Sequence, residues 1–135
     1  MAGGGESDAD VALADTSLFI AVEQERPLSA RPPKGVAVSV ITIAELQLGV
    51  LAAESGPVRA RRLETLSVAE ALDPLPVDAA AARAWAALRL ALRDAGRCMP
   101  INDSWIAAVA IANNLPVASQ DGDYDEVPGL QVIRV

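Results

Sequence analysis

The chain has 135 residues, of which 52% are hydrophobic, so it is large and apolar enough to fold as one domain around one core. A net charge of −7 and an aromatic content of only 3% argue against a basic nucleic-acid surface and against a binding surface of stacked aromatic rings. With one cysteine and no histidine, an internal disulfide and an ordinary zinc site are excluded, and a reducing, cytoplasmic setting is expected.

No part of the chain carries a signal for membrane insertion or export. Its apolar runs all stay well below the ~18 uninterrupted residues expected of a membrane helix. Residues 1–10 lack the basic and apolar regions of a signal peptide, and we expect them to form a flexible lead-in. Residues 11–135 are expected to form a single domain, and no membrane partner is expected.

In the first half of the chain, short apolar runs alternate with helical patterns. Each helical pattern begins next to small polar residues that favour helix N-termini, and a proline-containing loop separates the first helix from the next strand. The expected strands are residues 11–14 and 36–38, and the expected helices are residues 16–22, 40–53 and 55–66.

The second half continues this alternation. Asp78 is expected to cap a long alanine-rich helix that ends near Gly96. Alternating strands and helices favour a parallel α/β sandwich, in which functional sites lie beyond the carboxyl ends of the strands. The other expected elements are a brief strand within 71–77, a helix over 102–113, a strand over 116–119, a loop over 120–129 and a final strand over 130–135.

Four acidic residues lie inside or directly beside apolar segments. Asp15 and Asp121 each follow a short apolar strand. Glu45 interrupts an apolar helical run, and Asp103 opens another one. Carboxylates in apolar surroundings are costly unless they are paired, hydrogen-bonded or bound to a metal. Without histidine in the chain, this set indicates an all-oxygen site for Mg²⁺ or Mn²⁺.

Each aspartate also has an ordinary structural explanation. Asp15 and Asp103 fit the first turn of a helix, and Asp121 fits a turn. Glu45 is the hardest to explain in this way, because its neighbours are apolar. Taken together, the ordinary explanations have to be four unrelated ones, whereas one divalent-cation site accounts for all four acids. A cation removes their repulsion, lowers the pKa of a bound water and stabilises charge on a phosphate.

The segments around these acids resemble a known family. The sequences Asp-Thr-Ser, Ala-Glu-Leu-x-x-Gly and Asn-Asp-x-x-Ile-Ala-Ala are similar to the acidic motifs of PIN-domain proteins, and more closely to those of VapC-type toxins of bacterial toxin–antitoxin pairs. Their order and spacing match along essentially the whole chain after about residue 10. The matching segments are residues 14–17, 39–49, 101–108 and 119–124.

The resemblance implies a Rossmann-like α/β/α sandwich with a central, mainly parallel sheet. It implies the toxin of a toxin–antitoxin pair, an endoribonuclease that uses Mg²⁺ or Mn²⁺ to hydrolyse RNA phosphodiester bonds. Its expected partners are the RNA substrate, a second copy in a homodimer and a cognate VapB-type antitoxin. The resemblance assigns catalysis to Asp15, Glu45, Asp103 and Asp121, direct metal binding to Asp15, Asp103 and Asp121, possible metal binding to Glu45 and Asp123, and support of the first aspartate to Ser17.

Two other functions are compatible with parts of the sequence. A catalytically silent PIN-like interaction module would share the fold, but the intact set of acids counts against it. A phosphatase or receiver-like domain would need a lysine late in the chain, and the only lysine is Lys34.

The basic residues have two interpretations each. Arg89, Arg93 and Arg97 recur every four residues and either contact RNA phosphates or form a solvated helix face. The same choice applies to the arginines between residues 59 and 62. Trp85 lies on the same expected helix face as Leu88 and Leu92, and it is expected to pack in the core or in a dimer contact.

Overall fold

The computed structural model describes residues 11–31 and 33–135, so the lead-in expected over residues 1–10 lies outside the described part. Within that part, four strands form one sheet in the order β2-β1-β3-β4, and all neighbouring pairs are parallel, as expected. The strands are β1 (Val11–Ala14), β2 (Gly35–Ala37), β3 (Val117–Ser119) and β4 (Val132–Arg134).

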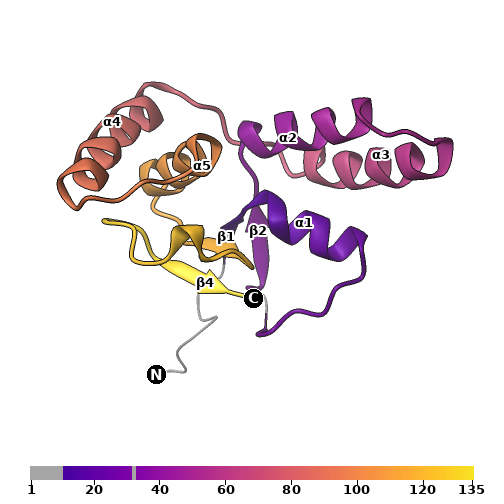
Figure 1. Ribbon diagram of the computed structural model, residues 1–135, viewed down its shortest axis with the longest axis horizontal. Coiled ribbons are helices and arrows are strands. Elements are labelled where there is room, and N and C mark those ends of the chain that lie inside the picture. Colours follow the sequence, from indigo (N-terminus) through magenta and orange to yellow (C-terminus); the bar gives the residue numbers. More distant parts are fainter. Residues whose placement is uncertain (1–10, 32) are drawn as a thin grey trace.

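Five α-helices surround this sheet in the described residues (Figure 1). One helix links β1 to β2, and the other four lie between β2 and β3 in the chain. None of the described helices is both long and apolar enough to cross a membrane. The helices are α1 (Thr16–Glu23), α2 (Val40–Leu51), α3 (Gly56–Glu70), α4 (Ala79–Asp94) and α5 (Ile101–Ala112).

The two faces of the sheet belong to two different hydrophobic clusters. Leu13 of β1 packs with residues of α4 and α5 such as Leu88 and Ile106. The neighbouring Ala12 points to the opposite face and packs with residues of α1, α2 and α3. Figure 1 shows α4 and α5 together on one side of the molecule and α1 to α3 on the other. The expected Rossmann-like α/β/α sandwich is therefore confirmed.

Local capping explains where two of the helices begin. Ser39 Oγ accepts a hydrogen bond from the backbone N–H of Thr42 at 3.3 Å, and Asp78 Oδ1 accepts one from Ala81 at 2.9 Å. Each bond satisfies a helical N–H that would otherwise have no partner, which is worth about 1 kcal/mol. Both caps confirm the sequence expectation.

The strand expected within residues 71–77 is wrong. Only Leu75 pairs there, in an isolated bridge to Ser39, with its N–H donating to the carbonyl of Val38 at 2.8 Å. Pro74 and Pro76 flank Leu75 and have no N–H, so the pairing cannot extend in either direction.

Two boundaries also differ from expectation. The helix α3 runs to Glu70, about one turn beyond the expected end. The final strand begins at Val132, because Gly129 adopts a positive φ of 77° and Leu130 donates its N–H to the carbonyl of Val127, closing a turn.

Candidate metal centre

Three carboxylates converge beyond the carboxyl ends of the strands. One side-chain oxygen from each of Asp103, Asp121 and Asp123 lies within 4.8 Å of the other two. Asp103 belongs to the first turn of α5. The other two come from the loop after β3, where Gly122–Tyr124 forms a single 3₁₀ turn. This group, called the acidic cluster below, brings the side chains of residues 103, 121 and 123 close together.

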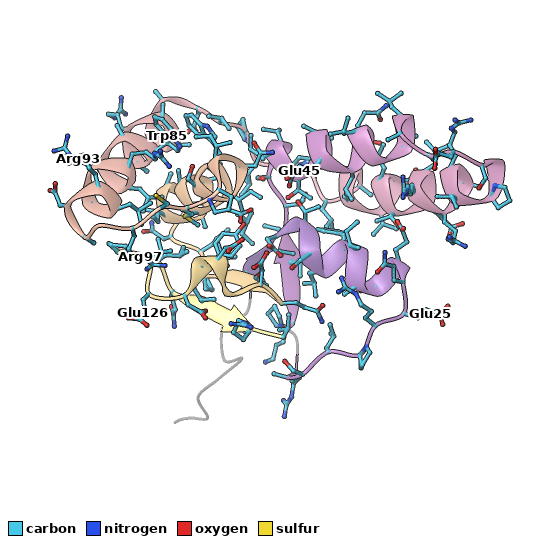
Figure 2. All side chains as sticks on the ribbon, viewed as in Figure 1. Glu25, Glu45, Trp85, Arg93, Arg97 and Glu126 are labelled. Carbon is cyan, nitrogen blue, oxygen red and sulfur yellow. The ribbon has the colours of Figure 1, made fainter. Side chains whose placement is uncertain are left out.

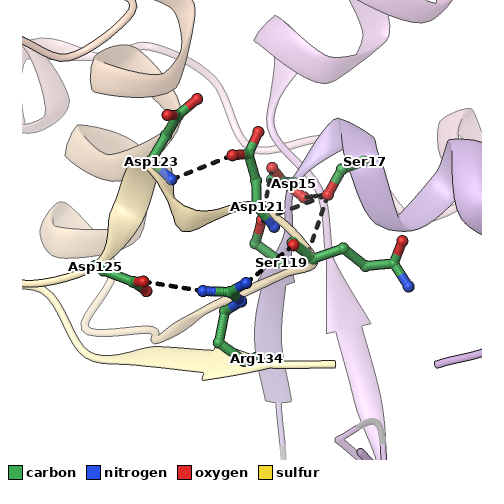
Figure 3. Close-up of polar contacts among 8 residues, drawn as sticks. Asp15, Ser17, Ser119, Asp121, Asp123, Asp125 and Arg134 are labelled. Carbon is green, nitrogen blue, oxygen red and sulfur yellow. Dashed lines mark hydrogen bonds and ion pairs between the residues drawn. The ribbon is translucent and has the colours of Figure 1, made fainter. Parts of the chain in front are cut away.

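Asp15 lies beside the acidic cluster and is held by hydroxyl groups (Figure 3). Its side chain is only 3% exposed. Ser17 Oγ donates to Oδ1 at 2.6 Å, and Ser119 Oγ donates to Oδ2 at 3.0 Å. The same Ser119 oxygen accepts the N–H of Asp121 at 2.8 Å, so one hydroxyl links the end of β1 to the loop after β3. The predicted supporting role of Ser17 has direct geometric support.

The carboxylate of Asp15 is in an unfavourable environment for a negative charge. Burial raises its pKa above the ordinary value, and the nearby charge of Asp121 raises it further. Hydrogen bonds from Ser17 and Ser119 lower the pKa again, but they do not offset the burial. Asp15 occupies the N-cap position of α1, as one explanation predicted, but its side chain makes no capping hydrogen bond to that helix.

The charged form of Asp103 is also destabilised by its surroundings. Its pKa is raised to about 7, first by burial and then by the neighbouring carboxylates of Asp123 and Asp121, while the phenol of Tyr124 lowers it. Across residues 11–31 and 33–135, the ion pairs are Arg93–Asp94 and Arg134–Asp125, so no arginine or lysine is paired with the acidic cluster. A divalent cation bound by oxygen ligands fits this excess of negative charge.

Glu45 is placed next to the acidic cluster by two neutral donors. Thr16 donates its hydroxyl hydrogen bond to Oε1, and Asn102 Nδ2 donates to Oε2 at 3.2 Å. These contacts tie α2 to the first turns of α1 and α5. Glu45 is not one of the three carboxylates that lie within 4.8 Å of one another. This position suits a group that orients a water molecule at the edge of the site.

Hydrogen bonds within the loop and from β4 fix the conformation of the loop that carries Asp121 and Asp123 (Figure 3). Asp121 Oδ1 accepts the N–H of Asp123 at 3.2 Å, so the predicted turn role of Asp121 is confirmed alongside its place in the cluster. Arg134 of β4 donates to Asp125 at 2.9 Å and to the carbonyl of Gln120 at 3.3 Å. This arginine therefore closes the loop without reaching the cluster itself.

Sequence reasoning missed the polar residues that hold the acids. Ser119, Thr16 and Asn102 each contact a candidate acid, although they had been assigned only to a strand or a helix start. The signal that could have identified them is the placement of small polar side chains directly beside acids at strand and helix ends.

The predicted arginine stripe on α4 is only partly free (Figure 2). Arg97, three residues beyond the end of α4, donates to the carbonyl of Glu126 at 2.6 Å, so it joins the segment after α4 to the loop after the 3₁₀ turn. The exposed Arg93 lies 3.5 Å from the carboxylate of Asp94. The contact of this stripe with RNA phosphates stays a prediction.

Trp85 packs between α4 and α5, in agreement with the expected packing role. Its ring stacks on Trp105 with centroids 4.4 Å apart and an interplanar angle of 4°. Its Nε1 donates to Ser104 at 3.0 Å, and the guanidinium of Arg89 lies 5.6 Å from its centroid.

Sequence comparisons match this chain to one protein family and to two ribonucleases within it. The family model described as PIN domain matches residues 12–130. The chain is 50% identical to Ribonuclease VapC5 of Mycobacterium tuberculosis (strain H37Rv) over 125 residues, which cover 90% of this chain and 93% of the relative. It is 44% identical to Ribonuclease VapC4 of the same strain over 128 residues, covering 92% and 96% of the two chains.

Solved structures agree with these sequence relatives. A member of the VapBC family of toxin–antitoxin systems, VapBC-5 from M. tuberculosis, superimposes with a TM-score of 0.85 at 46% identity. That match covers 94% of this chain and 100% of the other. FitAcB from Neisseria gonorrhoeae matches with a TM-score of 0.71 at 28% identity, over 92% of this chain and 96% of the other.

The charge repulsion in the acidic cluster leads to a stability prediction. Replacing Asp103 by Asn removes one charge beside two other carboxylates, so the metal-free variant should be more stable than the wild type, by about 1 kcal/mol or roughly 4 °C in melting temperature. Adding Mn²⁺ should then raise the melting temperature of the wild type more than that of the variant. Thermal unfolding followed by circular dichroism measures both effects.

Glu54→Gln serves as the matched control, since Glu54 is an exposed acid between α2 and α3. Its melting temperature should equal that of the wild type with and without Mn²⁺. A metal-free Asp103→Asn protein that melts below the wild type would contradict the account of repulsion in the cluster.

Proposed function

Because the chain belongs to the PIN-domain family and, within it, to the VapC ribonucleases of toxin–antitoxin systems, we propose that its acidic cluster binds Mg²⁺ or Mn²⁺ and hydrolyses RNA phosphodiester bonds. The observation that carries the proposal is the set of three carboxylate oxygens within 4.8 Å of one another, with no arginine or lysine paired to them in the described residues. Such a set is repulsive alone and suits an oxygen-binding cation.

In this proposal Asp15, Asp103 and Asp121 are the metal ligands, as the sequence predicts. Asp123 is the alternative to Asp121, because both are in the same 3₁₀ turn and both belong to the acidic cluster. When bound, a divalent cation would lower the pKa of a coordinated water molecule and offset negative charge on the phosphate. Mg²⁺ and Mn²⁺ share this preference for oxygen ligands, so the donor set is compatible with either.

The chain's own side chains orient the reacting groups. Ser17 and Ser119 hold both oxygens of Asp15, so this carboxylate keeps one direction. Glu45, fixed by Thr16 and Asn102, accepts a hydrogen bond from the attacking water and turns its lone pair toward the phosphorus. A silent interaction module would need none of these contacts, and no observation favours that function.

We also infer that a VapB-type antitoxin is the partner of this chain. The solved relative from M. tuberculosis is described as a member of the VapBC family of toxin–antitoxin systems. Support comes from a cavity of about 470 Å³ between α1 and α3, lined mainly by apolar side chains. Val22 and Val68 line this cavity and are 66% and 59% exposed, which suits an apolar segment of a partner.

The charge around the site fits the same partner. The carboxyl oxygen Oε1 of Glu23, which also lines the cavity, is buried without a hydrogen-bond partner in the described residues. Basic side chains of the antitoxin would pair with the Glu23 carboxylate and with the carboxylates of the acidic cluster. The homodimer implied by the family resemblance stays a prediction.

The test of the proposed reaction is the replacement of Asp15 by Asn. Because one ligand of the cation would lose its charge, cleavage of RNA should fall by at least about 100-fold. The rate is measured with purified protein, Mn²⁺ and total RNA, and circular dichroism checks that the variant is folded. The control is Asp94→Asn, an exposed acid on α4, which should cleave at the wild-type rate. Full activity of Asp15→Asn would rule out this assignment.

The partner proposal predicts that a small neighbouring gene encodes a DNA-binding antitoxin whose co-expression relieves growth arrest caused by this chain. Val68→Asp places a charge in the apolar cavity, so this variant should still cleave RNA but should escape neutralisation. Growth is measured after each toxin variant is induced together with the antitoxin.

Leu63→Asp is the control for Val68→Asp, since Leu63 is 46% exposed on the same helix but does not line the cavity. It should be neutralised like the wild type. If the neighbouring gene product leaves wild-type toxicity unchanged, the antitoxin proposal fails.

A further inference from the structure

A buried hydroxyl of α2 extends the hydrogen-bond network that holds Glu45. Thr42 is 0% exposed, and its backbone N–H donates to the capping hydroxyl of Ser39 at the start of the same helix. The Thr42 hydroxyl lies 3.0 Å from Oγ1 of Thr16 in α1, and this is the one hydrogen bond that it makes in the part of the chain that the structure describes. Thr16 Oγ1 in turn is hydrogen-bonded to Glu45 Oε1. Three oxygen atoms therefore form a chain that begins at a fully buried hydroxyl and ends at a candidate catalytic carboxylate.

The chemistry of these three groups fixes the direction of their protons. An ionised carboxylate only accepts hydrogen bonds, so the bond to Glu45 uses the single hydroxyl proton of Thr16. Thr16 then has no proton left to give, and Thr42 must be the donor in the bond between the two threonines. In the opposite arrangement Glu45 Oε1 would lose its donor, and the buried proton of Thr42 would have no acceptor among the described residues. The first arrangement is favoured, because it leaves no buried proton unpaired and includes a hydrogen bond to a charged acceptor.

The position of Thr42 in α2 suits an action on Glu45. The two residues are three positions apart on this helix, so their side chains lie on the same face of it. Figure 2 shows Glu45 on the side of α2 that faces α1. The second carboxylate oxygen of Glu45 is held separately, by Asn102 Nδ2 at 3.2 Å. A valine would fill the same space as Thr42 without supplying a proton, so packing alone does not explain a hydroxyl at this position.

We propose that Thr42 is a positioning residue for Glu45: its hydroxyl donates to Thr16, which commits the Thr16 proton to Oε1 of Glu45 and keeps that carboxylate turned toward the attacking water. This inference rests on the water-orienting role of Glu45 in the proposed function. Hydrogen bonds in a chain strengthen one another, so Thr42 acts on Glu45 through Thr16. Both donors are uncharged, so they orient the carboxylate without adding a positive charge beside the metal site.

The test compares two variants that separate the hydroxyl of Thr42 from its methyl group. Thr42→Val keeps the shape and removes the hydroxyl, so the Thr16 hydroxyl is free to rotate and kcat should fall about threefold to tenfold with KM unchanged. Thr42→Ser keeps the hydroxyl and removes a buried methyl group, so it should retain a kcat close to that of the wild type but melt at a lower temperature. Both kinetic constants are measured with purified protein, Mn²⁺ and total RNA. A role limited to packing predicts the opposite order, with Thr42→Ser less active than Thr42→Val.

A second measurement does not depend on activity. In crystals of the metal-free Thr42→Val protein, the Glu45 side chain should occupy more than one rotamer. In metal-free crystals of the wild type and of Thr42→Ser, it should keep the single position that faces Thr16. A single wild-type position of Glu45 in Thr42→Val, or an unchanged kcat in that variant, would overturn the inference.

The outcomes also separate this inference from the proposed function. Wild-type protein that cleaves no RNA in the presence of Mn²⁺ would overturn the proposed function, and the position of Glu45 in the Thr42→Val crystals would still decide whether Thr42 directs this carboxylate. Wild-type cleavage together with an unchanged rate in Thr42→Val would overturn the role of Thr42 alone and leave the proposed function standing.

Discussion

Repulsion between carboxylates is the constraint on which this site depends. Oxygens of Asp103, Asp121 and Asp123 lie within 4.8 Å of one another, and Asp15 is buried beside them. At such distances and with partial burial, negative charges oppose folding unless a positive charge joins them. Neither of the two ion pairs in the described part of the chain involves these residues. The fold therefore maintains a concentration of carboxylates whose negative charge a bound divalent cation would offset.

The architecture brings these charges together and holds them in place. β1 and β3 are neighbours in the sheet, so residues about a hundred positions apart meet at one edge, where the carboxyl ends of parallel strands meet. Uncharged hydroxyl and amide groups then orient the acids, and Arg134 fixes the loop from outside by pairing with Asp125. The positive charge needed to close the loop is directed away from the site, so it leaves room for a metal ion.

Much of the fold could be predicted because its determinants are local. Ser39 and Asp78 cap helices within three residues of themselves, and the apolar runs of β1 and β3 are visible in the sequence. The strand expected within 71–77 failed because Pro74 and Pro76 have no N–H and limit the pairing to Leu75.

The acids of the site could be predicted from their unusual apolar surroundings, but their supporting residues could not. Ser119 and Asn102 are ordinary surface-type residues in sequence, and their roles arise from contacts 104 and 57 positions away along the chain. Tyr124 lies in the segment expected to be a loop, and only the three-dimensional arrangement shows that its ring belongs to the hydrophobic core.

The most direct measurement is a crystal structure of the wild-type protein grown with Mn²⁺, with diffraction recorded for the anomalous signal of manganese. The account predicts an anomalous peak bounded by side-chain oxygens of Asp15, Asp103 and either Asp121 or Asp123, and the peak position decides between the last two. No peak in the acidic cluster at a Mn²⁺ concentration that supports RNA cleavage, or a peak only elsewhere on the molecule, would contradict it.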